Sequence, residues 1–109
     1  MMKIKTELDK LEKYLIDHRI TFERVDEDAV FDRENNTIIS YARHQIFVPE
    51  EGESCKWDAI CQPGSYGYET GKIEIFGELV TEEDRDSIVG KLTAEDVIKR
   101  IEARNRRTR

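Results

Sequence analysis

Apolar residues at helical spacing predict a helix near the N-terminus. They recur at intervals of four, three and four, at Ile4, Leu8, Leu11 and Leu15. This period places them on one stripe of a helix, and such a stripe is buried against a core. His18 continues the stripe, and we interpret it as a helix-end residue because a cation there complements the helix dipole.

A second helix is predicted near the C-terminus, where the start signal is clear. Thr93 is followed three residues later by Asp96, an acidic variant of the capping box in which each side chain bonds the other residue's backbone. The apolar positions that follow share one helix face, and they are Ala94, Val97, Ile98 and Ile101.

Between these helices, short apolar runs and alternating patterns are typical of strands. The strand-like segments are 20–25, 29–31, 37–41, 44–48, 54–61 and 72–77. Asn35-Asn36 favours a turn between the second and third segments, because asparagine tolerates a positive φ. The fold class is therefore α+β, a small antiparallel sheet of about four to five strands flanked by an N-terminal and a C-terminal helix. Whether residues 86–90 form a helical turn or an extended piece stays open.

The length of the chain bounds its organisation. With 109 residues, one core of ordinary size is expected, in a single α+β domain over 1–104 followed by a basic tail over 105–109. Multidomain enzymes and membrane-spanning segments are excluded on the same ground. The charged N-terminus carries no secretory signal, so we expect a cytoplasmic protein.

Acidic residues are concentrated in the middle of the chain. Residues 20–90 carry six basic and seventeen acidic side chains, whereas residues 91–109 carry seven basic and three acidic ones. Affinity for nucleic acid comes from Lys and Arg, so we expect no direct nucleic-acid binding and favour a protein partner with a basic surface. The acidic residues expected to contact it are Glu50, Glu51, Glu53, Glu82, Glu83, Asp84 and Asp86.

Residues 62–71 break regular structure with three glycines and one proline in ten positions. Tyr66 and Tyr68 in this loop suit a protein contact, because tyrosine gives a large contact area at small entropic cost. The alternative is that the loop packs on the sheet; we expect contact from Tyr66 and packing from Tyr68, which lies nearer the following strand. The loop lacks the spacing of a phosphate-binding or dinucleotide-binding motif, so no cofactor is predicted.

Two cysteines and two histidines limit the possible chemistry. On a strand Cys55 and Cys61 would lie about 20 Å apart, too far for a disulfide, so we expect reduced thiols. With only His18 and His44 besides, the four closely spaced ligands of a zinc site are missing. A catalytic group of Cys61, His44 and Asp58 across the second hairpin is kept as a minor alternative to ordinary packing, and we expect no enzyme.

Four segments stand out as a set: 44–48 (HQIFV), 57–69 (WDAICQPGSYGYE), 73–77 (IEIFG) and 92–98 (LTAEDVI). Through them the chain resembles a family of short proteins from phages and prophages of Gram-positive gut bacteria, over most of its length from His44 to Ile101. That family carries no assigned activity, so the resemblance transfers no catalytic residue. It implies a mobile-element setting, in which small acidic proteins often inhibit host defence nucleases, as anti-CRISPR proteins do.

Two functional hypotheses follow. The first is a non-enzymatic binding protein whose acidic surface occupies the basic nucleic-acid groove of a partner such as a Cas nuclease. The second is a phage accessory or assembly module that acts through homodimerisation at an exposed sheet edge, without inhibitor activity.

Overall fold

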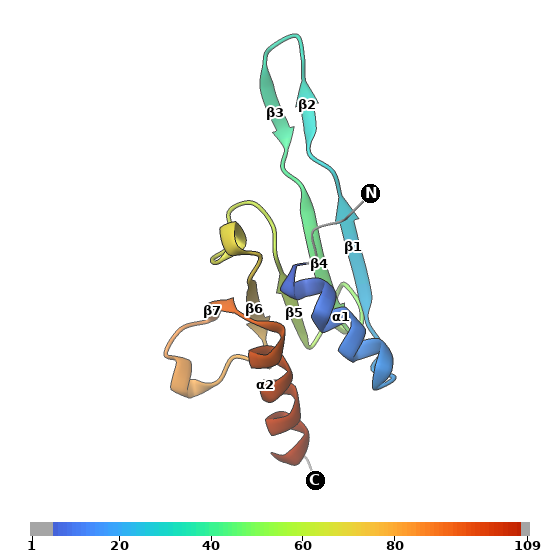
Figure 1. Ribbon diagram of the computed structural model, residues 1–109, viewed down its shortest axis with the longest axis vertical. Helices are drawn as coiled ribbons and strands as arrows, with labels where there is room; N and C mark the ends of the chain where they lie inside the picture. Colours follow the sequence, from blue (N-terminus) through green and yellow to red (C-terminus); the bar gives the residue numbers. More distant parts are fainter. Residues whose placement is uncertain (1–5, 108–109) are drawn as a thin grey trace.

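The computed structural model describes residues 6–107, with a helix at each end and strands between them (Figure 1). The helices are α1 (Glu7–Asp17) and α2 (Ala94–Arg107), and two short 3-10 helices are η1 (Tyr68–Thr70) and η2 (Glu82–Asp84). The strands are β1 (Glu23–Glu27), β2 (Val30–Asp32), β3 (Thr37–Ser40), β4 (Arg43–Val48), β5 (Trp57–Ile60), β6 (Ile73–Gly77) and β7 (Ile88–Leu92). The fold is α+β, which confirms the class predicted from the hydropathy pattern.

Five strands form one antiparallel sheet in the order β1-β4-β5-β6-β7. Both helices lie on one face of this sheet, where α1 packs against β4 and α2 (Figure 1). The buried apolar residues between the helices and the sheet are Leu8, Leu11, Leu15, Ile46, Val48, Trp57, Ala59, Cys61, Ile73, Ile75, Leu79, Ala94, Val97 and Ile101.

The strand register explains which residues enter this core. Ile46 pairs with Ala59, and Ala59 pairs with Ile75 across the three central strands. All three residues are fully buried. Because side chains alternate between the two faces of a sheet, every second residue of β4 and β5 points towards the helices.

The helix predictions are confirmed within the described residues. The backbone N–H of Thr93 donates to Asp96 Oδ2 at 3.0 Å, and the N–H of Asp96 donates to Thr93 Oγ1 at 3.1 Å, which completes the predicted capping box. His18 caps the C-terminus of α1 and stacks on Tyr14. Ile4 lies outside the described residues.

Some boundaries differ from those expected. β1 begins at Glu23 rather than at residue 20. Residues 88–92 form the strand β7, so the segment left open between a helical turn and an extended piece is extended. The helix α2 continues to Arg107, three residues into the segment predicted as a tail, while residues 108–109 lie outside the described part.

β2 and β3 form a two-stranded arm that stands away from the rest of the molecule (Figure 1). Residues 29–41 make up this arm, and the predicted turn is at its tip. There Asp32 Oδ1 accepts the backbone N–H of Glu34 at 3.0 Å, and Asn36 has a φ of 54°. The arm contributes to the elongated shape, which measures 56 × 34 × 28 Å.

The up-and-down path of β4 to β7 sorts the connecting loops between two ends of the sheet. The β4–β5 loop (49–56) and the β6–β7 connection (78–87) lie at one end, which we call the acidic end. The β5–β6 loop (61–72) lies at the opposite end, where the arm also leaves the sheet, and we call this the arm end (Figure 1).

Candidate binding surfaces and the ionic pocket

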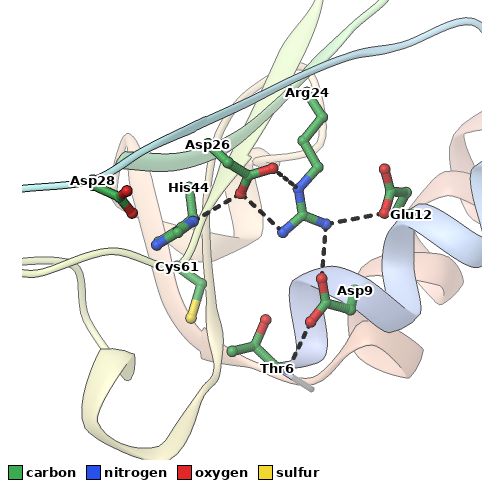
Figure 2. Close-up of a pocket in the computed structure, with 8 residues that line it drawn as sticks. All are labelled: Thr6, Asp9, Glu12, Arg24, Asp26, Asp28, His44 and Cys61. Carbon is green, nitrogen blue, oxygen red and sulfur yellow. Dashed lines mark hydrogen bonds and ion pairs between the residues drawn. The ribbon is translucent and has the colours of Figure 1, made fainter. Parts of the chain in front are cut away.

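A pocket of about 430 Å³ lies between α1 and the strands β1 and β4 (Figure 2). Four of its eight lining residues are acidic, and the lining consists of Thr6, Asp9, Glu12, Arg24, Asp26, Asp28, His44 and Cys61. This composition resembles neither an apolar ligand site nor a phosphate site.

Arg24 holds this pocket together. Its guanidinium lies 2.9 Å from Asp9 and 3.2 Å from Glu12, both on α1, and 2.9 Å from Asp26 on its own strand (Figure 2). Three carboxylates therefore surround one half-buried cation, which fastens α1 to the edge of the sheet. An arginine paired in this way is not available to bind an anionic substrate.

His44 and Cys61 both line the pocket, as the hypothesis of a catalytic group requires. His44 Nδ1 lies 2.8 Å from Asp26 Oδ1. Although burial raises it, hydrogen bonds from His44 and Arg24 hold the pKa of the Asp26 carboxyl below its ordinary value. The Cys61 side chain is buried, and burial together with the charge of Asp9 raises the pKa of its thiol. A thiol in this state is the opposite of an activated nucleophile.

Asp58, the third member of that hypothesis, lies on the other face of the sheet. It alternates with Trp57 and Ala59, which point to the helices. Its Oδ2 accepts a hydrogen bond from Gln45 Nε2 at 2.8 Å, and burial raises the pKa of this carboxyl. The structure therefore does not bring Asp58 to Cys61 and His44.

The states of the cysteines and of the possible metal ligands can be described for residues 6–107. Cys55 and Cys61 are both free thiols, in agreement with the prediction, although Cys55 is only half-buried. Within this range, no group of three or more His, Cys, Asp or Glu side chains is arranged to hold a metal ion. No described helix is both long and apolar enough to span a membrane.

The predicted acidic contact residues lie at the acidic end. Those exposed there are Glu50, Glu51 and Glu53 in the first loop and Glu82, Glu83 and Asp86 in the second. The two loops are separated in sequence by the core strands β5 and β6, and the antiparallel path of the sheet brings them to the same end.

Asp84 is the exception among these residues, because it is already paired. Both of its oxygens are bound by Arg100 of α2, at 2.8 and 2.9 Å, and its side chain is only 14% exposed. The hydrogen bonds from Arg100, followed by that from the Thr81 backbone, hold the pKa of Asp84 well below its ordinary range. Asp84 therefore anchors η2 to α2, and it is not presented to a partner as the other residues are.

A second pair, Arg104 with Glu78, joins the same two segments. The helix α2 runs from the arm end towards the acidic end. Its basic C-terminal half therefore lies next to the acidic loops. The basic and acidic segments seen in the sequence are therefore partly neutralised within the molecule.

The tyrosine loop lies at the arm end, so the structure separates Tyr66 and Tyr68 from the acidic contact residues. Tyr66 is 64% exposed and Tyr68 is 39% exposed. Tyr66 meets the expectation of an exposed side chain, whereas Tyr68, for which packing was expected, is partly covered and still exposed. The loop backbone is fixed, because the Tyr66 N–H donates to buried Glu74 at 2.9 Å and its carbonyl accepts from Lys91 at 3.0 Å.

The arm carries the largest group of exposed apolar side chains. Eight large hydrophobic residues of the described chain are exposed, and five of them belong to the arm: Val30, Phe31, Ile38, Ile39 and Tyr41. Sequence reasoning predicted this hairpin but missed the exposure of its side chains, since apolar strand residues are ordinarily buried. The available signal was that apolar neighbours stand side by side in both strands, which leaves neither face polar.

No protein-family model, no curated protein and no solved structure matches this chain. The resemblance to phage and prophage proteins therefore stays a prediction, and the function is argued from the geometry.

Proposed function

We propose that this chain is a non-enzymatic protein-binding protein that contacts its partner through the arm end, and that the partner presents a basic surface. The observation that carries the proposal is the arm, whose five large apolar side chains are between 46% and 67% exposed. Exposed apolar patches of this kind typically mark protein–protein interaction sites. Exposed Tyr66 lies at the same end of the sheet and extends the contact surface.

The state of the pocket supports a binding role over catalysis. Its arginine is bound by three carboxylates, and the pKa of its thiol is raised by burial. A catalytic site would be expected to hold a nucleophile with a lowered pKa or an acid–base pair with a free face. The ion pairs of Arg24 are better explained as the contact that fastens α1 to β1, the strand that leads into the arm.

The charge of the chain supports a basic partner. The arm and the residues that flank it, 26–43, carry five carboxylates and two arginines. The acidic end adds six exposed carboxylates. Such a distribution accelerates association with a positive surface and repels a nucleic-acid backbone.

The edges of the sheet give less support to the homodimerisation alternative. β1, at one edge, bears Glu23, Arg24, Asp26 and Glu27 within five residues. At the other edge, Lys91 of β7 has a φ of 58°, which interrupts regular pairing. Charged and irregular edge strands are features that discourage edge-to-edge association.

Affinity purification from the cells that carry the gene tests the proposal. We expect one protein to be retained at about 0.1 M salt and released as salt is raised, because a basic surface held by carboxylates is screened by ions. Retention of nucleic acid alone, or of no macromolecule, would contradict the proposal.

The resemblance suggests a specific form, in which the partner is a defence nuclease such as Cas9 with a basic nucleic-acid channel. At matched expression, the chain should then protect a targeted plasmid or phage from interference. Absence of protection would reject a defence nuclease as the partner. The general proposal of a basic protein partner would then be tested by the affinity purification alone.

A further inference from the structure

The arm is apolar on both of its faces. Phe31 pairs directly with Ile38, so these two side chains share one face. Val30 is the neighbour of Phe31 along β2 and therefore points to the other face, which it shares with its partner Ser40. The register shift between Val30 and Phe31 leaves Ile39 as the extra, unpaired residue of a bulge. A hairpin that rested on a flat surface would need only one such face.

Neither face of the arm is covered by the body of the molecule. Both helices pack on the five-stranded sheet, and the arm stands beyond that sheet (Figure 1). At about 150–250 Å² for each large side chain, the five half-exposed apolar residues offer on the order of 500 Å² of surface. A stable interface buries roughly 1,200–2,000 Å² in total. Walls on both sides of the arm bring the buried area to about 1,000 Å² in total, close to this range, whereas a wall on one side brings it to about half as much.

A second copy of the chain does not supply such an enclosure. A second arm laid on the first covers one face only, which buries about half of the available apolar surface and falls short of a stable dimer. The pocket beside Arg24 is lined by acidic side chains, and a smaller hollow is lined by Tyr14, Glu102, Asn105 and Arg106, so neither is an apolar receptacle. The charge of −6 on each copy also opposes association.

The charged residues next to the apolar side chains of the arm indicate the charge of the site that would bind it. Asp28 stands where the chain enters the arm, and Asp32 and Glu34 stand at its tip beside Arg33. Asp26 and Glu27, which precede Asp28, are paired with arginines of the sheet. The apolar side chains lie between these two acidic positions. A binding site on a partner that is complementary to the arm is therefore apolar in its middle and basic at its rim.

We infer that the arm inserts, with both faces buried, into an apolar cleft with a basic rim on a different protein. The inference rests on the proposed function and specifies how the partner is bound. The probe that tests it is a photo-crosslinking amino acid, p-benzoylphenylalanine, placed singly at four positions in the full chain. Phe31 and Val30 report the two faces of the arm, Glu83 reports the acidic end, and Ile16 on α1, itself 59% exposed, is the control.

After irradiation in the cells that carry the gene, the Phe31 and Val30 positions should give adducts with the same protein, at least fivefold above the Ile16 position. Mapping of the crosslinked peptides should place the two attachment points on opposite walls of one cleft. Adducts from one face only, or adducts with a second copy of the chain, overturn the inference. Adducts from one face only leave the proposed function standing. Adducts from Glu83 but not from the arm contradict both the inference and the proposed contact through the arm end, and so does the absence of any adduct.

Binding measurements with the partner so identified complete the test. Phe31→Ser and Val30→Ser should each raise Kd at least tenfold, because each removes the apolar contact of one face, whereas Ile16→Ser should leave Kd within twofold. Thermal unfolding of each variant checks that the arm variants remain folded. An effect from Phe31→Ser without one from Val30→Ser would mean that the arm lies on a surface and does not enter a cleft.

Discussion

Glu7, the first residue of α1, caps the other helix: its Oε1 accepts the backbone N–H of Ala94, the first residue of α2, at 2.8 Å. The two residues are 87 positions apart in the sequence. This bond satisfies one of the N–H groups that a helix start leaves without an intrahelical partner, and it places a negative charge at the positive end of the helix dipole. It thereby fixes the relative position of the two helices that cover the core.

Glu7→Ala should lower the free energy of unfolding by about 1 kcal/mol, the usual effect of losing a helix N-cap. Glu95→Ala, in the same helix turn but exposed, is the matched control and should change it by less than about 0.5 kcal/mol. Urea denaturation at neutral pH measures both. Equal effects of the two substitutions would show that the bond to Ala94 contributes nothing.

The same bond makes part of the stability depend on pH. The hydrogen bond from Ala94, followed by that from Lys10, lowers the pKa of the Glu7 carboxyl from its ordinary value of 4.5. A lowered folded-state pKa stabilises the protein above the unfolded-state pKa, and this contribution is lost as pH falls through the folded value. The unfolding curves of the wild type and Glu7→Ala should therefore converge below about pH 4. A difference that stays constant down to pH 2.5 would contradict this account.

Arg100→Met should destabilise the protein by about 1–3 kcal/mol, because it leaves the half-buried Asp84 carboxylate without the partner that binds both of its oxygens. Lys99→Met removes a neighbouring exposed cation and is the control. Since Arg100 lowers the pKa of Asp84, the variant should also lose less stability than the wild type on acidification. Chemical denaturation at pH 7 and pH 3 measures both effects.

Cys61 should be unreactive in the native state. It is 2% exposed and burial raises the pKa of its thiol, and both properties slow attack on a disulfide reagent. In a Cys55→Ser variant, which leaves Cys61 as the single thiol, titration should find no fast-reacting group before urea is added and one afterwards. Rapid native labelling would revive the hypothesis of a catalytic cysteine.

Tyr66→Ala and Tyr68→Ala should each change stability by less than about 1 kcal/mol, because both side chains are exposed. Gly90→Ala is the contrasting variant, since an added Cβ would lie 2.3 Å from Tyr66 Cβ and would push the loop off β7. Its cost should exceed that of either tyrosine substitution in urea denaturation. A large loss from Tyr68→Ala would mean that this side chain covers the sheet in solution.

Local signals in the sequence were sufficient for the elements of the fold. The Thr93–Asp96 box and the leucines of α1 act within a few residues, and their geometry follows from helix periodicity alone. The pairing of β1 with β4 joins Arg24 to Ile46, and no local pattern specifies such a partner. The same limit applies to the Arg24 cluster and to the bond between Glu7 and Ala94, which exist only once distant segments have packed.

The candidate site was predicted less completely than the fold. Charge counting found the acidic loops, but it treated Asp84 as free, and the orientation of α2 decides that Arg100 neutralises it. The exposure of Phe31 and Ile39 was missed for a different reason. Hydropathy indicates which side chains avoid water, and it does not show whether the chain itself or a partner covers them.

The most direct test of binding through the arm compares three forms of the chain as baits in quantitative affinity purification: wild type, the arm double variant Phe31→Ser/Ile39→Ser, and Ile16→Ser. Each bait is first shown to be folded by its thermal transition. One protein should be recovered equally with the wild type and Ile16→Ser, and at least tenfold less with the arm variant, because two central apolar contacts are lost. Equal recovery with all three baits would contradict the claim that the arm is the binding element.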